Sequence, residues 1–521
     1  MIWNRFHSAI AVVYLVALLA IGVLARRRRG DSNQFLNATG SLPLWVCVAA
    51  CIAANCGSLD VIAMMALGAQ YGMVACHFYW IGAVPALIVL AFWLLPAYAR
   101  ERYPSVLDFI GRCYGERTRS LVALCMAAMM LMLAGVCLCA AAQTLTTFFG
   151  WSFGAGVAVT AAVVMFYTWM GGLRATVYTE LLHFAVVLCA VTPLYFLVMR
   201  DFGSIAELLA KVPDEHRHVW AALPVIDPHA PMDVLGVIFG LGLVLSFGYW
   251  STDFVQMQRA LAVKNAADVP AVPLSMAAAK ILFSFLIVIP GVAAPLILGG
   301  HPAQGWNTTL PSLMKHYYPS AWVAIGILGL SASLVSTFAN NVSGFSAAWV
   351  QGLYQVWIRP RASEEHYLWM GRFTSVSAVL LAIGAAYAAL SYQSLMEFIQ
   401  LILSTFNAPL FALVVLGALV PRRAVGGGIA GLVAGLACAG AHQVMVRMGA
   451  LHYGSRMSAN FYAAMMSFSV TAIATLLAGR TAQVEACAKE SVDLRGRASA
   501  WTVLCAVVVG CVCLALNVLL R

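Results

Sequence analysis

Charged residues are scarce in this sequence. Only 10% of its 521 residues are Asp, Glu, Lys or Arg, whereas 62% are hydrophobic. A soluble globular protein carries about 25% charged residues, and no water-soluble fold buries this much apolar surface. The scarcity of charge therefore excludes a soluble protein and predicts that lipid forms part of the solvent around the chain.

Signatures of enzymes and of bound metals are also missing. The sequence contains neither His-Glu-x-x-His nor Gly-x-Ser-x-Gly, the patterns of zinc proteases and of serine hydrolases. Its 14 cysteines lie almost entirely within apolar segments, and no loop pairs Cys with His at the spacing of a zinc site. We therefore expect packing cysteines, no enzymatic activity and no organic cofactor.

Long apolar segments are abundant. Each is about 20 residues long, which is enough to cross a bilayer as an α-helix, and the alternating pattern of a membrane barrel is absent. We predict an all-α polytopic membrane protein with about fourteen transmembrane helices. Their ranges are 8–25, 42–67, 74–98, 119–147, 152–170, 174–199, 232–257, 270–299, 321–350, 366–392, 395–420, 424–447, 459–479 and 499–520.

The net charge of +10 arises from basic residues in alternate loops between the apolar segments. This asymmetry follows the positive-inside rule, so a membrane surface explains the charge and no nucleic-acid partner is expected. The rule predicts that loops 26–41 and 355–365 are cytoplasmic, and that loops 200–231 and 300–320 and both termini are outside. The four arginines at 26–29 follow the first apolar segment, which argues against a cleaved signal peptide. We expect a plasma membrane location, or the inner membrane in a bacterium.

Two predicted helices carry polar interruptions at membrane depth. The second contains Asn55, Gly57 and Asp60, and the seventh contains a polar stretch from Ser246 to Asp253. A polar group without a partner in lipid costs several kcal/mol, so such segments line a cavity or are buried in protein.

The two interrupted helices each open a set of five. Because five is odd, the two sets would lie inverted in the membrane, and paired interrupted helices of inverted repeats indicate a central binding site. We therefore predict one transmembrane domain over 1–521. It would contain a first repeat at 42–199 and a second at 232–420, with an extra helix at 8–25 and further helices at 424–520.

The ninth predicted helix has a polar face. Ser333, Ser336 and Thr337 are spaced so that they share one side of a helix. One interpretation is hydrogen bonding between helices. The other is a cation site, since hydroxyls and free carbonyls replace the hydration shell of a monovalent ion without burying a full charge.

Three carboxylates lie at membrane depth, namely Asp60, Glu180 and Asp253. Each is either a functional group or half of a structural pair with Lys280 or with an arginine near the cytoplasmic face. If Asp60 and Asp253 face one cavity without partners, a cationic or zwitterionic solute is expected.

Several motifs resemble those of the sodium:solute symporter family, which includes the sodium–glucose and sodium–proline cotransporters. The most specific runs from Thr168-Trp169-Met170-Gly171-Gly172-Leu173-Arg174-Ala175 to Thr179-Glu180. Others are Tyr103–Phe109 with Arg112–Gly115, Ser41–Pro43 through Ala53–Asn55, and Ser336-Thr337 with Leu353-Tyr354. The resemblance covers about residues 5–480, and implies a LeuT-type five-plus-five inverted repeat with flanking helices.

The resemblance also implies site residues. Sodium would be bound by backbone carbonyls of Ala53, Cys56 and Ser333 and by the hydroxyls of Ser336 and Thr337. A second ion or a proton would bind at Glu180 and Asn340, and substrate or gate residues would be Asn55, Asp60, Tyr249, Trp250, Asp253 and Gln400. Glu180 replaces the usual aspartate, and Ala339 and Asn340 stand where serines would hold the second sodium. The polar residues that hold sugar hydroxyls are largely absent, so a sugar is not the first expectation.

The function predicted from these features is secondary active transport of a small organic solute, driven by sodium through alternating access. Proton coupling remains an alternative, as does a solute-sensing or channel-like protein of the same fold. The substrate and the oligomeric state are left open by the sequence.

Overall fold

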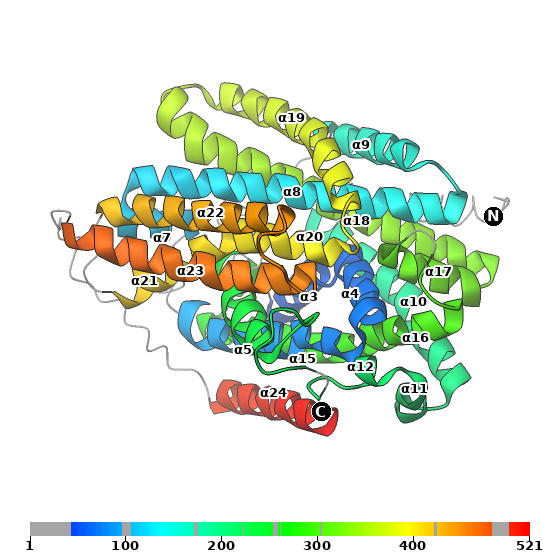
Figure 1. Cartoon of the computed structure of the whole chain (residues 1–521). Helices are drawn as coiled ribbons and strands as arrows, with labels where there is room; N and C mark the ends of the chain where they lie inside the picture. Colours follow the sequence, from blue (N-terminus) through cyan, green and yellow to red (C-terminus); the bar gives the residue numbers. More distant parts are fainter. Residues whose placement is uncertain are drawn as a thin grey trace.

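A computed structural model of the chain describes residues 43–95, 106–170, 176–221, 223–253, 259–260, 262–302, 305–420, 425–481 and 500–521. Long helices running side by side make up most of this part (Figure 1). Ten of the described helices are long and apolar enough to cross a membrane, so the protein is a multi-pass membrane protein. The predicted helix at 8–25 and the loop at 26–41 lie outside the described residues, and the number of fourteen spans stays a prediction.

The helices follow the predicted order. The first predicted repeat contains α3 (Leu44–Asn55), α4 (Ser58–Tyr71), η1 (Gly72–Cys76), η2 (Phe78–Ala83), α5 (Val84–Val89), η3 (Leu90–Leu94), α7 (Val106–Tyr114), α8 (Glu116–Phe149), α9 (Phe153–Met170) and α10 (Thr176–Phe202). The polar segment that follows carries α11 (Ile205–Lys211) and α12 (Asp214–Arg217).

The second predicted repeat contains η5 (Gly236–Ser246), α13 (Phe247–Thr252), α15 (Ala271–Phe283), η7 (Ser284–Val288), α16 (Ile289–Leu298), α17 (Thr309–Tyr317), α18 (Ser320–Trp349), η9 (Val350–Ile358), α19 (Glu364–Leu390), α20 (Leu395–Ile402), η10 (Leu403–Asn407) and α21 (Ala408–Leu419). Three helices follow it: α22 (Val425–Arg447), α23 (Arg456–Thr481) and α24 (Ala500–Leu519).

Helices of the two predicted repeats pack against each other in two groups. α3 contacts α15, α4 contacts α16 and η2 contacts η5, so the first two helices of each set form one group. α8 and α9 contact α18 and α19, so the third and fourth helices of each set form another. This pairing supports the two-repeat organisation predicted from the spacing of the interrupted helices.

The interruption predicted in the second apolar segment is confirmed. α3 ends at Asn55 and α4 begins at Ser58, and between them Cys56 leaves the helical conformation with φ −96° and ψ 37°. Gly57 is extended, and a Cβ atom at this position would lie 3.2 Å from Oγ of Ser333 on α18. A glycine is therefore needed here because α18 approaches the break closely.

The interruption predicted at 246–253 in the seventh apolar segment is placed differently. Helical structure is continuous from Gly236 to Thr252, with π-helical turns as far as Ser246. The hydroxyls of Ser251 and Thr252 donate to the Gly248 carbonyl and hold the last turn together. The chain first leaves the helix at Asp253, with φ −70° and ψ 95°. The polar stretch therefore lies in the α-helical end of this segment and continues the helix instead of breaking it.

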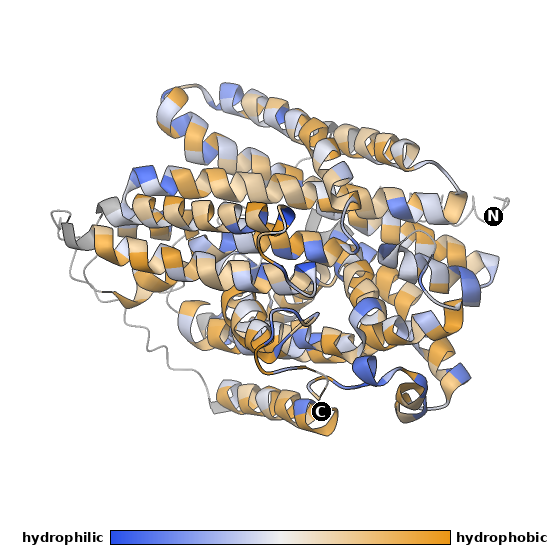
Figure 2. Cartoon of the chain, in the orientation of Figure 1, coloured by the Kyte–Doolittle hydropathy of each residue, from blue (hydrophilic) through white to orange (hydrophobic). Residues whose placement is uncertain are grey.

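Hydrophobic residues predominate along the long helices, whereas hydrophilic residues gather at helix ends and in the connecting segments (Figure 2). Leu381 on α19, Val433 on α22 and Val508 on α24 are each at least half exposed. Such surfaces suit contact with lipid. α7 and α11 lie toward opposite ends of the long helices, as the predicted topology requires of the loops that contain them (Figure 1).

The last helix is attached to the polar segment between the repeats. The Val219 amide donates to the Leu520 carbonyl at 3.2 Å, and the Trp220 indole N–H donates to Asn517 Oδ1 at 2.9 Å. Nε2 of His77 in turn lies 2.7 Å from the Val219 carbonyl oxygen, and the His77 ring contacts that of Trp220 at a tilt of 43°. The end of α24 and this segment therefore lie on the same side of the molecule, in agreement with the predicted topology.

Candidate functional site

A central cavity of about 400 Å³ lies where the broken helix α3–α4 meets α13, α18 and α20. Its lining contains every site residue predicted from the sequence except Cys56, although these residues come from distant parts of the chain. They are Ala53, Asn55, Asp60, Glu180, Tyr249, Trp250, Asp253, Ser333, Ser336, Thr337, Asn340 and Gln400. The structure therefore brings the predicted ion and solute residues to one place.

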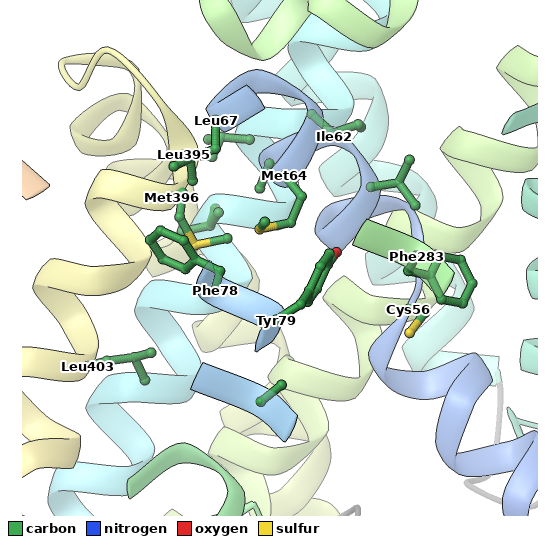
Figure 3. Packing of buried hydrophobic residues seen from close by; sticks show 14 of the residues in the cluster. Cys56, Ile62, Met64, Leu67, Phe78, Tyr79, Phe283, Leu395, Met396 and Leu403 are labelled. Atoms are coloured by element: carbon green, nitrogen blue, oxygen red, sulfur yellow. The ribbon is translucent and has the colours of Figure 1, made fainter. Parts of the chain in front are cut away.

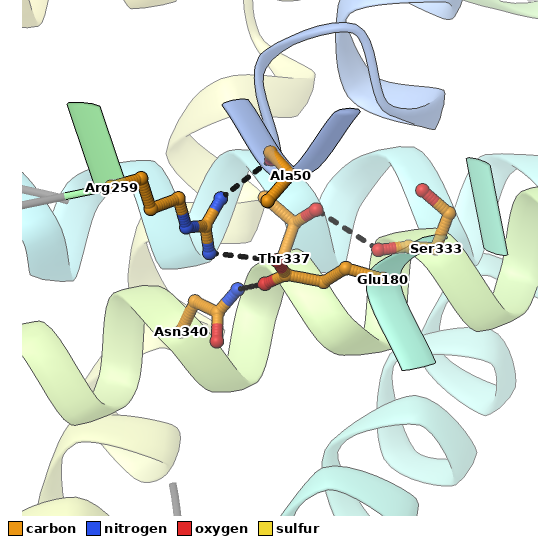
Figure 4. Close-up of polar contacts among 6 residues, drawn as sticks. All are labelled: Ala50, Glu180, Arg259, Ser333, Thr337 and Asn340. Carbon is orange, nitrogen blue, oxygen red and sulfur yellow. Dashed lines mark hydrogen bonds and ion pairs between the residues drawn. The ribbon is translucent and has the colours of Figure 1, made fainter. Parts of the chain in front are cut away.

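The break between α3 and α4 faces the polar side of α18. Measured from a Cβ built on Gly57, the Ala53 carbonyl oxygen lies at 3.8 Å and Thr337 Oγ1 at 3.9 Å, so these oxygens surround one point. The Thr337 hydroxyl donates to the Ser333 carbonyl at 2.9 Å (Figure 4). The Ser333 hydroxyl accepts from the Ser58 amide at 3.0 Å, which fixes α4 to α18.

Ser336 differs from its neighbours on α18. Its side chain is 4% exposed, and among the described residues its hydroxyl oxygen has no hydrogen-bond partner. A buried hydroxyl without a partner costs about 1–3 kcal/mol, so a ligand that uses it would recover this free energy. Hydroxyl and carbonyl oxygens are ligands for a hard monovalent cation, and the residues at the break fit such an ion.

Asp60 is not an unpaired acid, which corrects one of the alternatives drawn from the sequence. Its Oδ2 accepts from Nζ of Lys280 at 3.0 Å and from the Tyr79 hydroxyl at 2.8 Å. The ammonium of Lys280 also lies 4.7 Å from the centre of the Tyr79 ring. The premise of two free carboxylates, and with it the argument for a cationic solute, is therefore wrong.

Tyr79 belongs to the apolar wall beside this pair. In Figure 3 its ring stands between α4 and the neighbouring helices, with Met64 and Phe78 nearby and Cys56 at the break. Phe78 and Tyr79 are both buried. Met396 on α20 is buried too, and it also lines the cavity. A solute in the cavity would thus contact apolar side chains on several sides and a few polar groups, as small-molecule sites usually do.

Glu180 forms the second ion pair of the cavity. Its Oε2 lies 2.7 Å from an Nη atom of Arg259, and its Oε1 accepts from the Asn340 amide at 2.6 Å (Figure 4). The other Nη of Arg259 donates to the Ala50 carbonyl at 3.1 Å. Of the two interpretations for Glu180, the structure thus shows the pair with an arginine.

The remaining predicted residues connect the two repeats. The Asn55 amide donates to the Tyr249 hydroxyl at 3.3 Å, so the end of α3 contacts α13. Tyr249 also interacts with Asp253, and its ring meets that of Trp250 edge to face. Gln400 is buried, and among the described residues its Oε1 has no partner.

Sequence reasoning named Lys280 only as a possible structural partner of the membrane acids, and it did not place Tyr79 or Arg259 in the site. Lys280 is the one charged residue in the apolar segment 270–299, and that isolation was a usable signal. The side chain of Arg259, which follows the seventh apolar segment, is only 13% exposed because it turns back to Glu180. No local sequence pattern predicts that the Arg259 side chain reaches Glu180.

Comparison with known proteins agrees with the geometry. Residues 35–435 match the family model described as "Sodium:solute symporter family". The chain belongs to this family. The symporter is 24% identical to the mouse sodium/glucose cotransporter 1 over 473 residues, which cover 83% of the chain and 70% of that protein. It is 25% identical to the mouse sodium/myo-inositol cotransporter 2 over 466 residues, which cover 82% and 68%.

Solved structures show the same fold. A substrate-bound, outward-open sodium-coupled sialic acid symporter superposes with a TM-score of 0.73 at 15% identity, covering 92% of the symporter and 98% of that chain. The inward-facing structure of Mhp1 gives 0.54 at 12% identity, covering 90% and 95%. The predicted all-α transporter fold of the LeuT type is thus confirmed. As a family member, the protein is a sodium-coupled solute transporter and not an enzyme.

Proposed function

We propose that the symporter binds sodium between the break of α3–α4 and the polar face of α18. The carbonyls of Ala53, Cys56 and Ser333 and the hydroxyls of Ser336 and Thr337 would be its ligands. The observation that carries this proposal is the buried Ser336 hydroxyl without a partner, one residue from a hydroxyl that faces the break. Sodium there would join α18 to the broken helix and so couple ion binding to the position of α3.

The formal charges around the cavity support a solute without net charge. Among the described residues, the lining contains the three carboxylates of Asp60, Glu180 and Asp253 and the two cations Arg259 and Lys280. One negative charge is left over, and a single sodium ion would balance it. Because an unbalanced charge is costly in a membrane interior, a neutral or zwitterionic solute suits the sodium-loaded cavity better than a charged one.

The spare hydrogen-bonding capacity of the cavity supports a solute rich in donors. Among the described residues, Asn55 Oδ1 and Gln400 Oε1 have no partner, and Asp60 uses only Oδ2 in its contacts with Lys280 and Tyr79. Asn55 Oδ1, Gln400 Oε1 and Asp60 Oδ1 are all hydrogen-bond acceptors. A small solute bearing several hydroxyl or amine hydrogens would satisfy them, and leaving them unmatched would cost affinity. Polyhydroxyl compounds of the kind named for the curated relatives belong to this class.

The cavity is closed on the side predicted to face outward. There Gln70 and Tyr71, at the end of α4, both donate to Oε1 of Glu397 on α20 at 3.1 Å. Toward the predicted cytoplasmic ends of α8 and α18, Met126 and Gln351 still line the cavity. We assign this arrangement to an inward-facing state in the plasma membrane, from which α4 and α20 would separate to admit solute from outside.

Proton coupling is the second candidate, because Asp60 and Glu180 are carboxylates in the membrane interior. Both are engaged by cations, at 3.0 Å and 2.7 Å, which favours the hydroxyl site for a metal ion over a carboxylate site for a proton.

The test uses purified symporter and proteoliposomes. Thermal stabilisation would be measured against hexoses, inositols, amino acids and organic cations, with and without sodium, since binding raises the melting temperature by mass action. Uptake of the stabilising solute would then be driven by a sodium gradient or by a pH gradient. We expect stabilisation by a neutral, donor-rich solute that sodium strengthens. Uptake that ignores sodium and follows the pH gradient would overturn the proposal.

A further inference from the structure

We propose that Arg259 is a tethered cation that permanently occupies the Glu180 carboxylate, so that the symporter carries a single sodium ion per cycle. This inference rests on the proposed sodium site at the break of α3–α4. It adds the number of coupling ions and assigns Arg259 as the residue that sets it.

The first argument is that both oxygens of Glu180 are already engaged and that the charge of the carboxylate is already neutralised. Oε2 is engaged by Arg259 at 2.7 Å and Oε1 by the Asn340 amide at 2.6 Å, both through N–H donors. The Glu180 side chain is only 6% exposed, so the guanidinium lies at the carboxylate with little water between or around them. A planar guanidinium in this position supplies the positive charge that a metal ion would otherwise provide.

The second argument is the position of the pair relative to the proposed sodium site. Ala50, which accepts from Arg259, precedes the proposed ligand Ala53 by three residues on α3. Asn340, which donates to Glu180, follows the proposed ligand Thr337 by three residues on α18. The Arg259 pair therefore lies one helical turn from the sodium site on both helices. Two sodium ions and a guanidinium so close together would repel one another strongly.

The third argument is mechanical. Through Arg259, the carbonyl of Ala50 on α3 is joined to Glu180 on α10, and through Asn340 also to α18 (Figure 4). Arg259, which pairs with the Glu180 carboxylate, therefore also holds α3 against α10 and α18. Loss of the guanidinium should loosen α3 as well as free the carboxylate.

The number of bound sodium ions tests the proposal directly. Radioactive sodium alone would be titrated onto purified symporter, and the ions bound per chain counted at saturation. We expect one ion in the wild type. Arg259→Gln should bind a second ion at the vacated carboxylate, and the double variant Arg259→Gln/Glu180→Gln should return to one. Arg259→Lys, which keeps a cation, is the matched control and should bind one.

Loosening of α3 gives a second readout that does not depend on ion counting. Cys47 on α3 is 1% exposed, whereas Cys139 on α8 is equally buried and lies outside the Arg259 contacts. In Arg259→Gln, we expect a maleimide to modify Cys47 several times faster than in the wild type. Cys139 should react as slowly as before, and mass spectrometry of the peptides separates the two sites.

Two outcomes would overturn the inference. One is a wild type that binds two sodium ions, and the other is an Arg259→Gln variant that still binds one ion with Cys47 as slow to react as before. If the wild type binds no sodium, or if Ser336→Ala leaves binding unchanged, the proposed sodium site itself is wrong, which is a different result. If Arg259→Gln does not fold, the wild-type count and the Arg259→Lys variant still decide.

Discussion

Ser336 and Thr337 are adjacent on α18, and their hydroxyls differ in what they contact. The Thr337 hydroxyl donates to the Ser333 carbonyl, whereas that of Ser336 is buried without a partner in the described part of the chain. We predict that Ser336→Ala and Thr337→Ala each raise the sodium concentration for half-maximal stabilisation about tenfold, roughly 1.4 kcal/mol, because one ligand oxygen is lost. Expression should be normal, since Ala packs well between membrane helices.

A serine away from the site provides the control for this pair. Ser377 on α19 donates only to the Phe373 carbonyl of its own helix. Ser377→Ala should leave the sodium titration unchanged. If Ser336→Ala and Thr337→Ala behave like this control, the polar face of α18 serves helix packing, and the sodium site must be sought elsewhere.

Asp60 and Lys280 form a buried pair, with side chains 18% and 4% exposed. Removing one partner leaves the other charge buried, which costs about 3–5 kcal/mol. We predict that Asp60→Asn and Lys280→Gln each lower the melting temperature and abolish uptake of the stabilising solute. The double variant Asp60→Asn/Lys280→Gln should regain much of the melting temperature without regaining uptake. Equal stability of the wild type and both single variants would show that the pair does not contribute.

The sequence identified Asp60 as important and offered Lys280 as one candidate partner, but it could not decide whether this pair forms. An acid at membrane depth is rare enough to be noticed alone, whereas Lys280 lies 220 residues further along the chain. Pairing over that distance depends on how α4 and α15 pack, and residue spacing does not determine it. The same holds for Glu180 and Arg259.

Close contact between α4 and α16 depends on two glycines. Gly291 on α16 lies against the backbone of α4, and Gly68 on α4 lies against the backbone at the start of α16. A Cβ on Gly291 would lie 2.4 Å from the Met65 carbonyl oxygen, and one on Gly68 would lie 2.7 Å from the Val288 carbonyl oxygen. We predict that Gly291→Ala destabilises the protein by about 1–3 kcal/mol, because the two helices must move apart. The measurement is thermal unfolding of purified protein.

Gly384 on α19 is the matched control for this substitution, because a Cβ there meets nothing within 4 Å. Gly384→Ala should leave the melting temperature unchanged or raise it slightly, since alanine favours the helix. If the two variants unfold at the same temperature, the close approach of α4 and α16 does not limit stability.

At the level of whole elements, sequence reasoning succeeded where composition alone decides the structure. Apolar length located the helices, and Asn55, Gly57 and Asp60 together marked the break between α3 and α4. It was less accurate for the seventh apolar segment, where the same kinds of residue are accommodated in a continuous helix up to Thr252. The hydroxyls of Ser251 and Thr252 bond to the Gly248 carbonyl of their own helix, and residue type alone does not distinguish such a stretch from a broken one.

For the molecule as a whole, the orientation in the membrane is the main prediction to test. Glu215→Cys in the polar segment between the repeats should react with an impermeant maleimide added outside intact cells. Lys264→Cys, in the loop after α13, should react only after the membrane is opened. Both positions are exposed. The reverse pattern would invert the topology drawn from the distribution of arginines.

The convergence of the predicted residues on one cavity is the strongest success of the sequence at this scale. It depended on the resemblance to the sodium:solute symporter family, which implied these positions, and on the paired polar interruptions, which indicated a central site. The solute is not determined in this way. Recognition of the solute depends on a few hydrogen bonds. Which protein groups remain available for them depends on contacts between side chains, such as that of Asn55 with Tyr249.

The contact of α24 with the polar segment near Val219 and Trp220 has a practical consequence. The carbonyl of Leu520 and the side chain of Asn517 both take part in it, next to Arg521. A fluorescent protein joined directly after Arg521 would therefore strain the contact between α24 and the segment that bonds to His77. A reporter placed there needs a flexible spacer, and one joined without it should show reduced yield of folded transporter.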